Sequence, residues 1–453
     1  MESLLLYSLC IYLLIILGMA FFISKKTENE EEFLVGGRKF NLWLTTFCLF
    51  ATWFGAGTLI TATDEVANEG LRVTALEPYG AGACLILAGI FFAKPLWEMK
   101  LMTYADFFKI KFGARVEFLS VILNIPIYVG WIAVQIVSLA NILAVFFPLP
   151  VWSLILLISL FSCIVTISGG MWSVSITDSF QLFIIVIGLI YLLFKVSGGS
   201  FESANSMISG VANQHLTWIP TEKLSDTMKW IGLFCISALG NMTGQDLGQR
   251  MFSARSAKVA KYGCILAGLG YIIIGSIPVF MGLTSSVTLG NFEGSVIPNL
   301  IKIFLDPISA VILTITIVSS VISTITSALL APASMLSHNY LTHKFEKYST
   351  LFLSKVGVVI VTLISVATAF AGEDVYSLLE GSYTMGFVGF FVPVTVGLYS
   401  KKLDEKACLI AIFSGILIWS PEFFGYNDFP YSLIAVVLSY PIYFLCYKFF
   451  QKS

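Results

Sequence analysis

Four hydroxyl side chains recur at helical spacing within one strongly apolar run. Thr316, Ser319, Ser320 and Ser323 stand at i, i+3, i+4 and i+7, which places them on one face of a helix. A hydroxyl in such a helix can simply return a hydrogen bond to the carbonyl four residues earlier, and that explains many of them. Neutral oxygens that converge on one face also suit Na⁺, a hard cation that prefers oxygen ligands. We favour the sodium site over simple hydrogen bonding within the helix.

A second apolar run, residues 40–63, is interrupted at its centre. It is long enough to cross a bilayer, yet Gly55, Ala56, Gly57 and Thr58 support a helix poorly. Unwound backbone is tolerated inside a membrane only where it faces protein or a wet cavity. It then offers carbonyl oxygens to cations and a half-helix N-terminus to anions. Close packing of small residues between helices is the alternative interpretation.

Carboxylates inside apolar runs are costly, and so they are candidates for function. Glu77 begins the run 74–98, where it can accept hydrogen bonds from a solute, act as its counter-ion, or remain hydrated at the membrane surface. Asp178 begins another run on the predicted cytoplasmic side, where a carboxylate stabilises a helix N-terminus. Asp246 and Arg250 stand four residues apart, and we expect them to pair with each other.

Two tryptophans lie in the middle of apolar runs rather than at their ends. Trp53 comes immediately before the glycine break, and Trp131 follows Tyr128 by three residues. Aromatic faces hold a quaternary ammonium group well, because the ring quadrupole attracts a cation that cannot donate hydrogen bonds. Packing of each tryptophan against a neighbouring helix is the simpler explanation. Two of them near one candidate site favour the ammonium interpretation.

The composition is that of a polytopic membrane protein, with 57% hydrophobic and 12% charged residues and a mean hydropathy of +0.89. The net charge of −1 gives no basic surface for a nucleic acid. The eight cysteines form no CxxC pair, which argues against a disulfide framework or a zinc site. No glycine-rich phosphate loop followed by lysine is present, so ATP-driven transport has no support.

Hydropathy predicts thirteen membrane spans, at residues 3–23, 40–63, 74–98, 117–147, 151–168, 176–196, 228–252, 259–285, 307–337, 353–371, 376–399, 406–420 and 430–449. Lys and Arg are concentrated on one side of these spans. Of the 26, all but five lie there, the exceptions being Arg72, Lys195, Lys223, Lys229 and Lys302. The positive-inside rule then predicts an N-terminus outside and a cytoplasmic C-terminus in the inner cell membrane.

We expect a single transmembrane transporter domain over residues 1–453. It would comprise the first span and a cytoplasmic loop (1–39), a five-helix repeat (40–196), an extracellular loop (197–227), a second five-helix repeat (228–400) and two C-terminal spans (401–453). Five spans in each half place the two repeats in opposite orientations. The second half also opens with an interrupted run, because Gly240 and Gly244 lie within it. Two broken helices, each first in its half, indicate the binding site of a secondary transporter.

Four segments, in order along the chain, resemble motifs of the sodium:solute symporter family. They are residues 33–38 with 49–52, residues 169–181, residues 244–250 with 256–258, and residues 319–323. The resemblance implies an all-α protein with the leucine-transporter-like fold of thirteen transmembrane helices, in which a five-plus-five inverted repeat carries two broken helices. It also implies Na⁺ held by the carbonyls of Ala51, Phe54 and Thr316 and the hydroxyls of Ser319 and Ser320.

The resemblance also implies contacts for the solute. Glu77, Ser237 and Asn241 fall where sugar-transporting members contact or gate their substrate, and Asp178 falls on the inner sodium path. Residues 51–57, 91–95 and 173–178 also resemble the choline-transporting branch of this family. The full set of predicted substrate contacts is Trp53, Thr58, Glu77, Tyr79, Trp131, Ser237 and Asn241.

Only half of the aromatic choline cage of that branch carries over. Trp53 and Trp131 match two of its walls. Ala81 stands where a cage tyrosine is expected, with Tyr79 nearby, and Gly244 stands where a cage tryptophan is expected. A related or bulkier ammonium compound would suit such a half-open cage.

The sequence therefore predicts a sodium-coupled symporter, not an enzyme, which imports a small organic solute by alternating access. Choline or a related quaternary ammonium compound is the first candidate. The alternatives are a symporter for a sugar, amino acid or carboxylate, a solute-sensing membrane receptor, and an ion channel. Nothing in the sequence bears on a role for chloride or on the oligomeric state.

Overall fold

Long apolar runs of this chain fold as helices, because a helix satisfies its backbone hydrogen bonds within one segment and lipid offers no partners. The computed structural model describes residues 2–290, 292–303, 306–371, 375–426 and 429–451. Over these residues the chain is helical and has no strand, with one isolated bridge between Phe40 and Ala254. Nine segments of the described chain are long and apolar enough to cross a membrane, and two shorter apolar helices accompany them.

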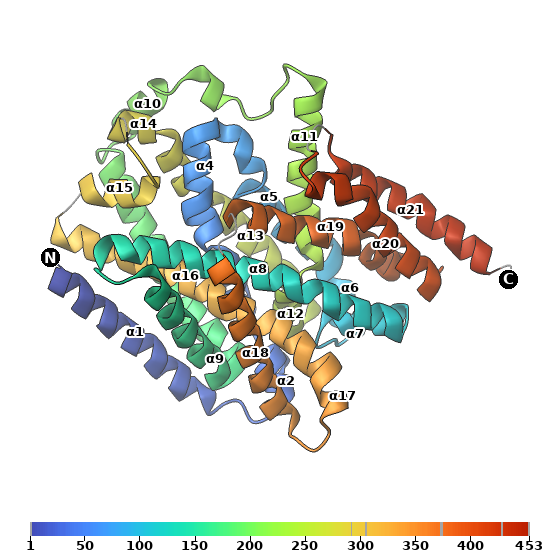
Figure 1. Cartoon of the computed structure of the whole chain (residues 1–453). Helices are drawn as coiled ribbons and strands as arrows, with labels where there is room; N and C mark the ends of the chain where they lie inside the picture. The colour runs from blue at the N-terminus through green and yellow to red at the C-terminus, as the bar shows by residue number, and fades with distance from the viewer. Residues whose placement is uncertain (1, 291, 304–305, 372–374, 427–428, 452–453) are drawn as a thin grey trace.

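The long helices carry most of the fold (Figure 1). They are α1 (Glu2–Ser24), α8 (Ala114–Phe146), α9 (Val151–Val196), α13 (Ala257–Leu283), α16 (Pro307–Leu336), α18 (Thr350–Ala371), α19 (Val375–Tyr399), α20 (Glu405–Phe423) and α21 (Tyr431–Phe450). α16 lies in the interior, where it packs against α9, α8, α18 and α3 (Leu42–Trp53). Its serine and threonine hydroxyls are therefore buried among other helices rather than exposed to lipid.

Shorter helices connect and flank these. Toward the N-terminus they are α2 (Glu30–Val35), η1 (Gly36–Arg38), η3 (Gly70–Ala75), α5 (Tyr79–Leu87), η4 (Ala88–Phe92), α6 (Ala93–Glu98) and α7 (Tyr104–Lys111). Later come α10 (Phe201–Ser209), η5 (Asn213–Leu216), α14 (Ser285–Leu289), α15 (Val296–Ile303), η8 (Ser337–Leu341) and α17 (Thr342–Lys344).

The predicted spans 151–168 and 176–196 form one helical segment, α9, which is interrupted at Gly170. This residue has φ 54° and ψ −133°, values that do not belong to a helix and that a side chain would disfavour. At 1.5 Å per residue a straight helix of 46 residues would be about 69 Å long, more than twice the hydrocarbon thickness of a bilayer. The break at Gly170 is consistent with two membrane crossings within α9. The count of thirteen spans and the inverted repeat stay predictions.

The first predicted helix break is confirmed. α3 ends at Trp53, and helical structure resumes with η2 (Gly57–Thr61) and α4 (Ala62–Glu69). Phe54 has φ −77° and ψ 69°, and the Gly55 amide donates to the carbonyl of Trp53 at 2.8 Å. The Ala56 amide, freed at the start of the second half-helix, donates to Gln135 Oε1 at 2.7 Å. The unwound backbone is thus satisfied by protein, as its depth in the membrane requires.

The second predicted break is also confirmed. α11 (Leu224–Cys235) continues as η6 (Ile236–Gly240) and η7 (Asn241–Thr243), and α12 (Gln245–Ser253) begins after it. Gly244 separates the two halves with an extended backbone, φ −67° and ψ 133°.

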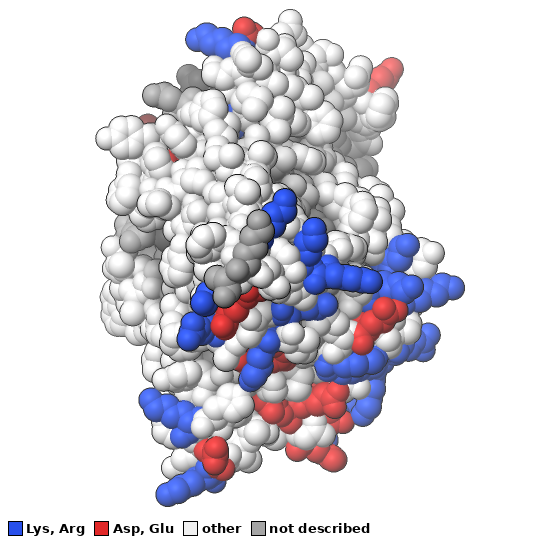
Figure 2. Space-filling view, turned by 90° about the vertical axis from the view of Figure 1, so that its right-hand side faces the viewer, with Lys and Arg blue, Asp and Glu red and all other residues white. Residues whose placement is uncertain are grey.

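Charged side chains gather toward one end of the face that Figure 2 presents. Figure 2 shows Lys and Arg, with several Asp and Glu, over the lower half of the face that it presents, while the upper half is mostly uncharged. The lower end is where α2 and α17 lie in Figure 1. The charge asymmetry read from the sequence is therefore also an asymmetry in space.

Candidate functional site

Buried hydroxyls of α16 meet the carbonyls exposed by the break in α3. Ser320 Oγ donates to the Phe54 carbonyl at 2.6 Å. Ser323 Oγ and Thr324 Oγ1 lie 3.2 and 3.4 Å from the carbonyl of Ala51. That carbonyl lacks its usual helical donor, because the Gly55 amide turns to Trp53 instead. This oxygen cluster offers only neutral ligands of the kind that a hard cation such as Na⁺ prefers.

The predicted sodium ligands are brought together in part. Ser320 joins Ala51 and Phe54, whereas the hydroxyl of Ser319 donates to Tyr12 of α1 at 2.8 Å. The hydroxyl of Thr316 donates to the carbonyl of Ile312 at 2.8 Å. The predicted sodium ligand at this residue is its main-chain oxygen, not this hydroxyl. Thr324 was not among the predicted ligands, although its position four residues after Ser320 was a usable signal.

Asp178 connects to the same region through a chain of buried polar groups. Its Oδ2 accepts from Ser327 Oγ at 2.8 Å, and Ser327 in turn lies 3.2 Å from Thr52 Oγ1 in α3. The other carboxylate oxygen of Asp178 is buried and has no hydrogen-bond partner. Ser327 lies about one turn beyond Ser323 on α16. A polar route therefore runs from Asp178 toward the oxygen cluster.

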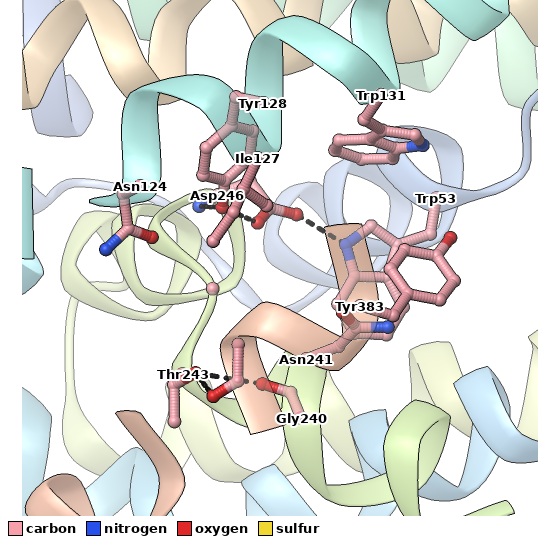
Figure 3. Close-up of a pocket in the computed structure, with 12 residues that line it drawn as sticks. Trp53, Asn124, Ile127, Tyr128, Trp131, Gly240, Asn241, Thr243, Asp246 and Tyr383 are labelled. Carbon is pink, nitrogen blue, oxygen red and sulfur yellow. Dashed lines mark hydrogen bonds between the residues drawn. The ribbon is translucent and has the colours of Figure 1, made fainter. Parts of the chain in front are cut away.

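A pocket lies where the two helix breaks meet. Figure 3 shows side chains from α3, α8, the second break and α19 converging on it. It is lined by Trp53, Asn124, Ile127, Tyr128, Trp131, Gly240, Asn241, Thr243, Gly244, Asp246, Tyr383 and Gly386. Of the predicted substrate contacts, Trp53, Trp131 and Asn241 are brought together here.

The acidic side chain of this pocket is Asp246. Trp53 Nε1 donates to its Oδ2 at 2.5 Å, and the Tyr128 hydroxyl donates to its Oδ1 (Figure 3). The expected pairing with Arg250 is wrong, because the Arg250 guanidinium donates instead to the main-chain carbonyl of Asp246 at 2.9 Å. Helical spacing indicated proximity, but the Asp246 carboxylate has its donors on other helices, which spacing alone does not reveal.

Glu77 does not line the pocket. It is buried against the hydroxyls of three residues, Thr58 at 2.9 Å, Tyr271 at 3.0 Å and Tyr383 at 3.2 Å. Tyr383 is also a wall of the pocket, so Glu77 contacts the lining through that side chain. The geometry makes Glu77 a group that positions Tyr383.

Two further predicted contacts also lie outside the lining. Ser237 Oγ donates to the main-chain carbonyl of Leu76 at 2.7 Å, which ties the second broken helix to the segment before α5. The Tyr79 hydroxyl lies 3.1 Å from Ser276 Oγ, and its ring packs edge-on against Trp218. Both residues therefore support neighbouring elements rather than the pocket.

The pocket combines aromatic walls with one carboxylate. Among the lining residues that the structure describes, Trp53, Tyr128, Trp131 and Tyr383 supply four aromatic rings, and none is Lys or Arg. Aromatic faces and a carboxylate both attract positive charge. Asn124, Asn241 and Thr243 add neutral hydrogen-bonding groups. This arrangement suits a small organic cation that also carries a polar group.

Comparison with known proteins places these features in context. The chain matches the Sodium:solute symporter family over residues 33–415. The relative described as High affinity choline transporter 1 from Homo sapiens is 25% identical, with 96% of this chain and 83% of that protein covered. A Sodium/proline symporter from Staphylococcus aureus is 23% identical, with 96% of this chain and 91% of that protein covered.

The fold has a solved counterpart. A Na⁺-coupled sialic acid symporter, in a substrate-bound outward-open state, superimposes with a TM-score of 0.83 and 19% identity. The alignment covers 97% of each chain. At this level of identity the likeness establishes the fold alone.

Proposed function

Because the chain belongs to the sodium:solute symporter family, we propose that it couples Na⁺ entry to the import of a small organic cation, with choline or a related ammonium compound as the first candidate. The observation that carries this proposal is the pocket at the two helix breaks, whose aromatic walls surround the Asp246 carboxylate. The choline transporters among its relatives support the same class of solute.

Sodium would bind at the oxygen cluster formed by Ser320, Ser323 and Thr324 of α16 and the carbonyls of Ala51 and Phe54. The cluster bridges α3 and α16, so a cation bound there would hold these helices together. Phe54, a ligand of the cation, follows directly after Trp53, a wall of the pocket. Sodium that orders the break would therefore also order the pocket. The coupling is reciprocal, since bound solute must raise the affinity for sodium by the same factor.

The membrane topology is part of the proposal. The distribution of Lys and Arg supports a cytoplasmic C-terminus and an N-terminus outside. Two broken helices, each opening one half of the chain, support the division into repeats 40–196 and 228–400 and the count of thirteen spans. Asp178, with its chain of hydroxyls toward the cluster, would lie on the inner sodium path.

A neutral solute is the second candidate, supported by Asn124, Asn241 and Thr243 in the pocket lining and by relatives described as sodium/proline and sodium/myo-inositol transporters. Thermal unfolding of the detergent-purified protein separates the two. Choline, betaine, proline and myo-inositol would each be added in NaCl and in KCl, since a ligand that binds the folded state raises its stability. We expect a sodium-dependent rise with the organic cation. A rise with proline or myo-inositol alone would favour the second candidate.

A further inference from the structure

We infer that Asp246 makes this pocket prefer organic cations that carry an N–H bond over quaternary ammonium ions, which carry none. The inference rests on the proposed transport of an organic cation and names the subclass of cation. It starts from the fact that the carboxylate belongs to the pocket wall and is 3% exposed.

The carboxylate is fixed by two donors from different helices. Trp53 Nε1 of α3 binds Oδ2, and the Tyr128 hydroxyl of α8 binds Oδ1. An ionised carboxylate accepts about four hydrogen bonds, so these two donors leave acceptor positions free on both oxygens. Arg250 does not occupy them, because it donates to the main chain. The carboxylate is therefore held in place with capacity for a further donor.

Gly244 keeps one of those oxygens open. A Cβ at this position would stand 2.7 Å from Asp246 Oδ1, closer than a carbon atom can come to that oxygen without a shift. Any other residue would therefore crowd the carboxylate. Glycine leaves space beside Oδ1, and both residues line the pocket.

The two classes of cation would meet this carboxylate differently. A protonated primary, secondary or tertiary amine can donate a charge-assisted hydrogen bond to it, which is stronger than a neutral one. The nitrogen of a quaternary ammonium is surrounded only by methyl or methylene groups, so the carboxylate loses water and gains no charge-assisted hydrogen bond from that nitrogen. Trp53 and Trp131 attract both cations through their ring faces, so they do not discriminate between them. The discrimination is therefore concentrated at Asp246.

Choline and N,N-dimethylethanolamine form a matched pair for the test, because they differ by one methyl group in place of one N–H. Sodium-driven uptake of each by the purified protein in liposomes would be measured at pH 7, where the amine is protonated. We expect the amine to half-saturate uptake at a concentration about tenfold lower or more, since one well-placed hydrogen bond to a charge gives at least that factor.

Two variants locate the effect. Asp246→Asn keeps the size of the side chain and removes its charge, and we expect the advantage of the amine to fall to within about threefold. Tyr383→Phe changes another wall of the pocket whose hydroxyl bonds to Glu77 rather than to Asp246, so it should keep the advantage. The wild-type ratio tests the inference even if Asp246→Asn fails to fold.

The outcomes distinguish the inference from the function on which it rests. Sodium-dependent uptake that favours choline, or is equal for both compounds, would overturn the inference and leave the proposed function standing. An unchanged ratio in Asp246→Asn would remove Asp246 as the selecting group. Uptake of neither compound with sodium would overturn the proposed function itself.

Discussion

Replacement of Ser320 by alanine should raise the sodium requirement of transport. The Ser320 hydroxyl lies 2.6 Å from the Phe54 carbonyl in a fully buried position, away from bulk water. A contact between a neutral group and a charge contributes about 1.5–3 kcal/mol. At 1.4 kcal/mol per tenfold change, the sodium concentration for half-maximal uptake should rise roughly 10- to 150-fold.

The assay is uptake of the labelled solute into proteoliposomes as a function of external Na⁺, with K⁺ holding the ionic strength constant. Thr326→Val is the matched control, because Thr326 is buried in the same helix and its hydroxyl bonds only to the carbonyls of Ile322 and Ser323. The control should keep the wild-type sodium curve. Thermal unfolding of both variants without sodium would show whether they fold equally well.

An unchanged sodium curve in Ser320→Ala would refute the reasoning, and so would an equal shift in Thr326→Val. Ser319→Ala sharpens the result, since the Ser319 hydroxyl donates to Tyr12 rather than to the oxygen cluster. A smaller shift than that of Ser320→Ala is expected from this geometry. A larger shift would mean that Ser319 turns to the cation when sodium binds.

The remaining predictions concern the pocket, the packing of α16 and its N-terminus. Trp131→Ala should weaken binding of an organic cation by about 1–2 kcal/mol, roughly 5- to 30-fold, and weaken an uncharged isostere less, which titration of uptake would measure. Gly188→Ala should destabilise the protein by about 1–3 kcal/mol, because the added Cβ would stand 1.8 Å from Thr316 Oγ1. Gly389→Ala is the control, since a Cβ there meets nothing within 4 Å, and thermal unfolding of the two variants measures the difference. Hydrogen bonds from Ser309 lower the pKa of Asp306 from 3.8 to about 2, so its charge stabilises the folded state above pH 3.8 and this contribution is lost as the pH falls toward about 2. The thermal midpoint of Asp306→Asn should accordingly lie below that of wild type at pH 6, and the difference should shrink over that acidic range.

Both helix breaks could be predicted because their cause is local. Glycines and small polar residues within an apolar run lower helix stability wherever the run packs, so Gly55 and Gly244 marked the interruptions without knowledge of the fold. The charge asymmetry was equally accessible, because it depends only on where Lys and Arg lie along the sequence relative to the apolar runs. Trp53 was singled out from its place beside the first break, and Asn241 from the resemblance to sugar-transporting members of the family.

Side-chain partners between helices could not be predicted in the same way. Asp246 was expected to pair with Arg250 because a sequence shows which side chains are neighbours on one helix, but not which helices pack together. Its real partners, Trp53 and Tyr128, lie 193 and 118 residues away in the chain, and only packing brings them together. Glu77 was predicted to contact the solute because a carboxylate inside an apolar run is costly and because of the family resemblance. Its three hydroxyl partners come from three separate elements.

The most direct test of sodium-coupled import is uptake of a labelled organic cation by proteoliposomes under an inward Na⁺ gradient, compared with an equal K⁺ gradient. The account predicts accumulation above the external concentration with Na⁺, which collapses when the gradient is dissipated, and only equilibration with K⁺. Equal uptake under both gradients, or equilibration without accumulation under Na⁺, would contradict it.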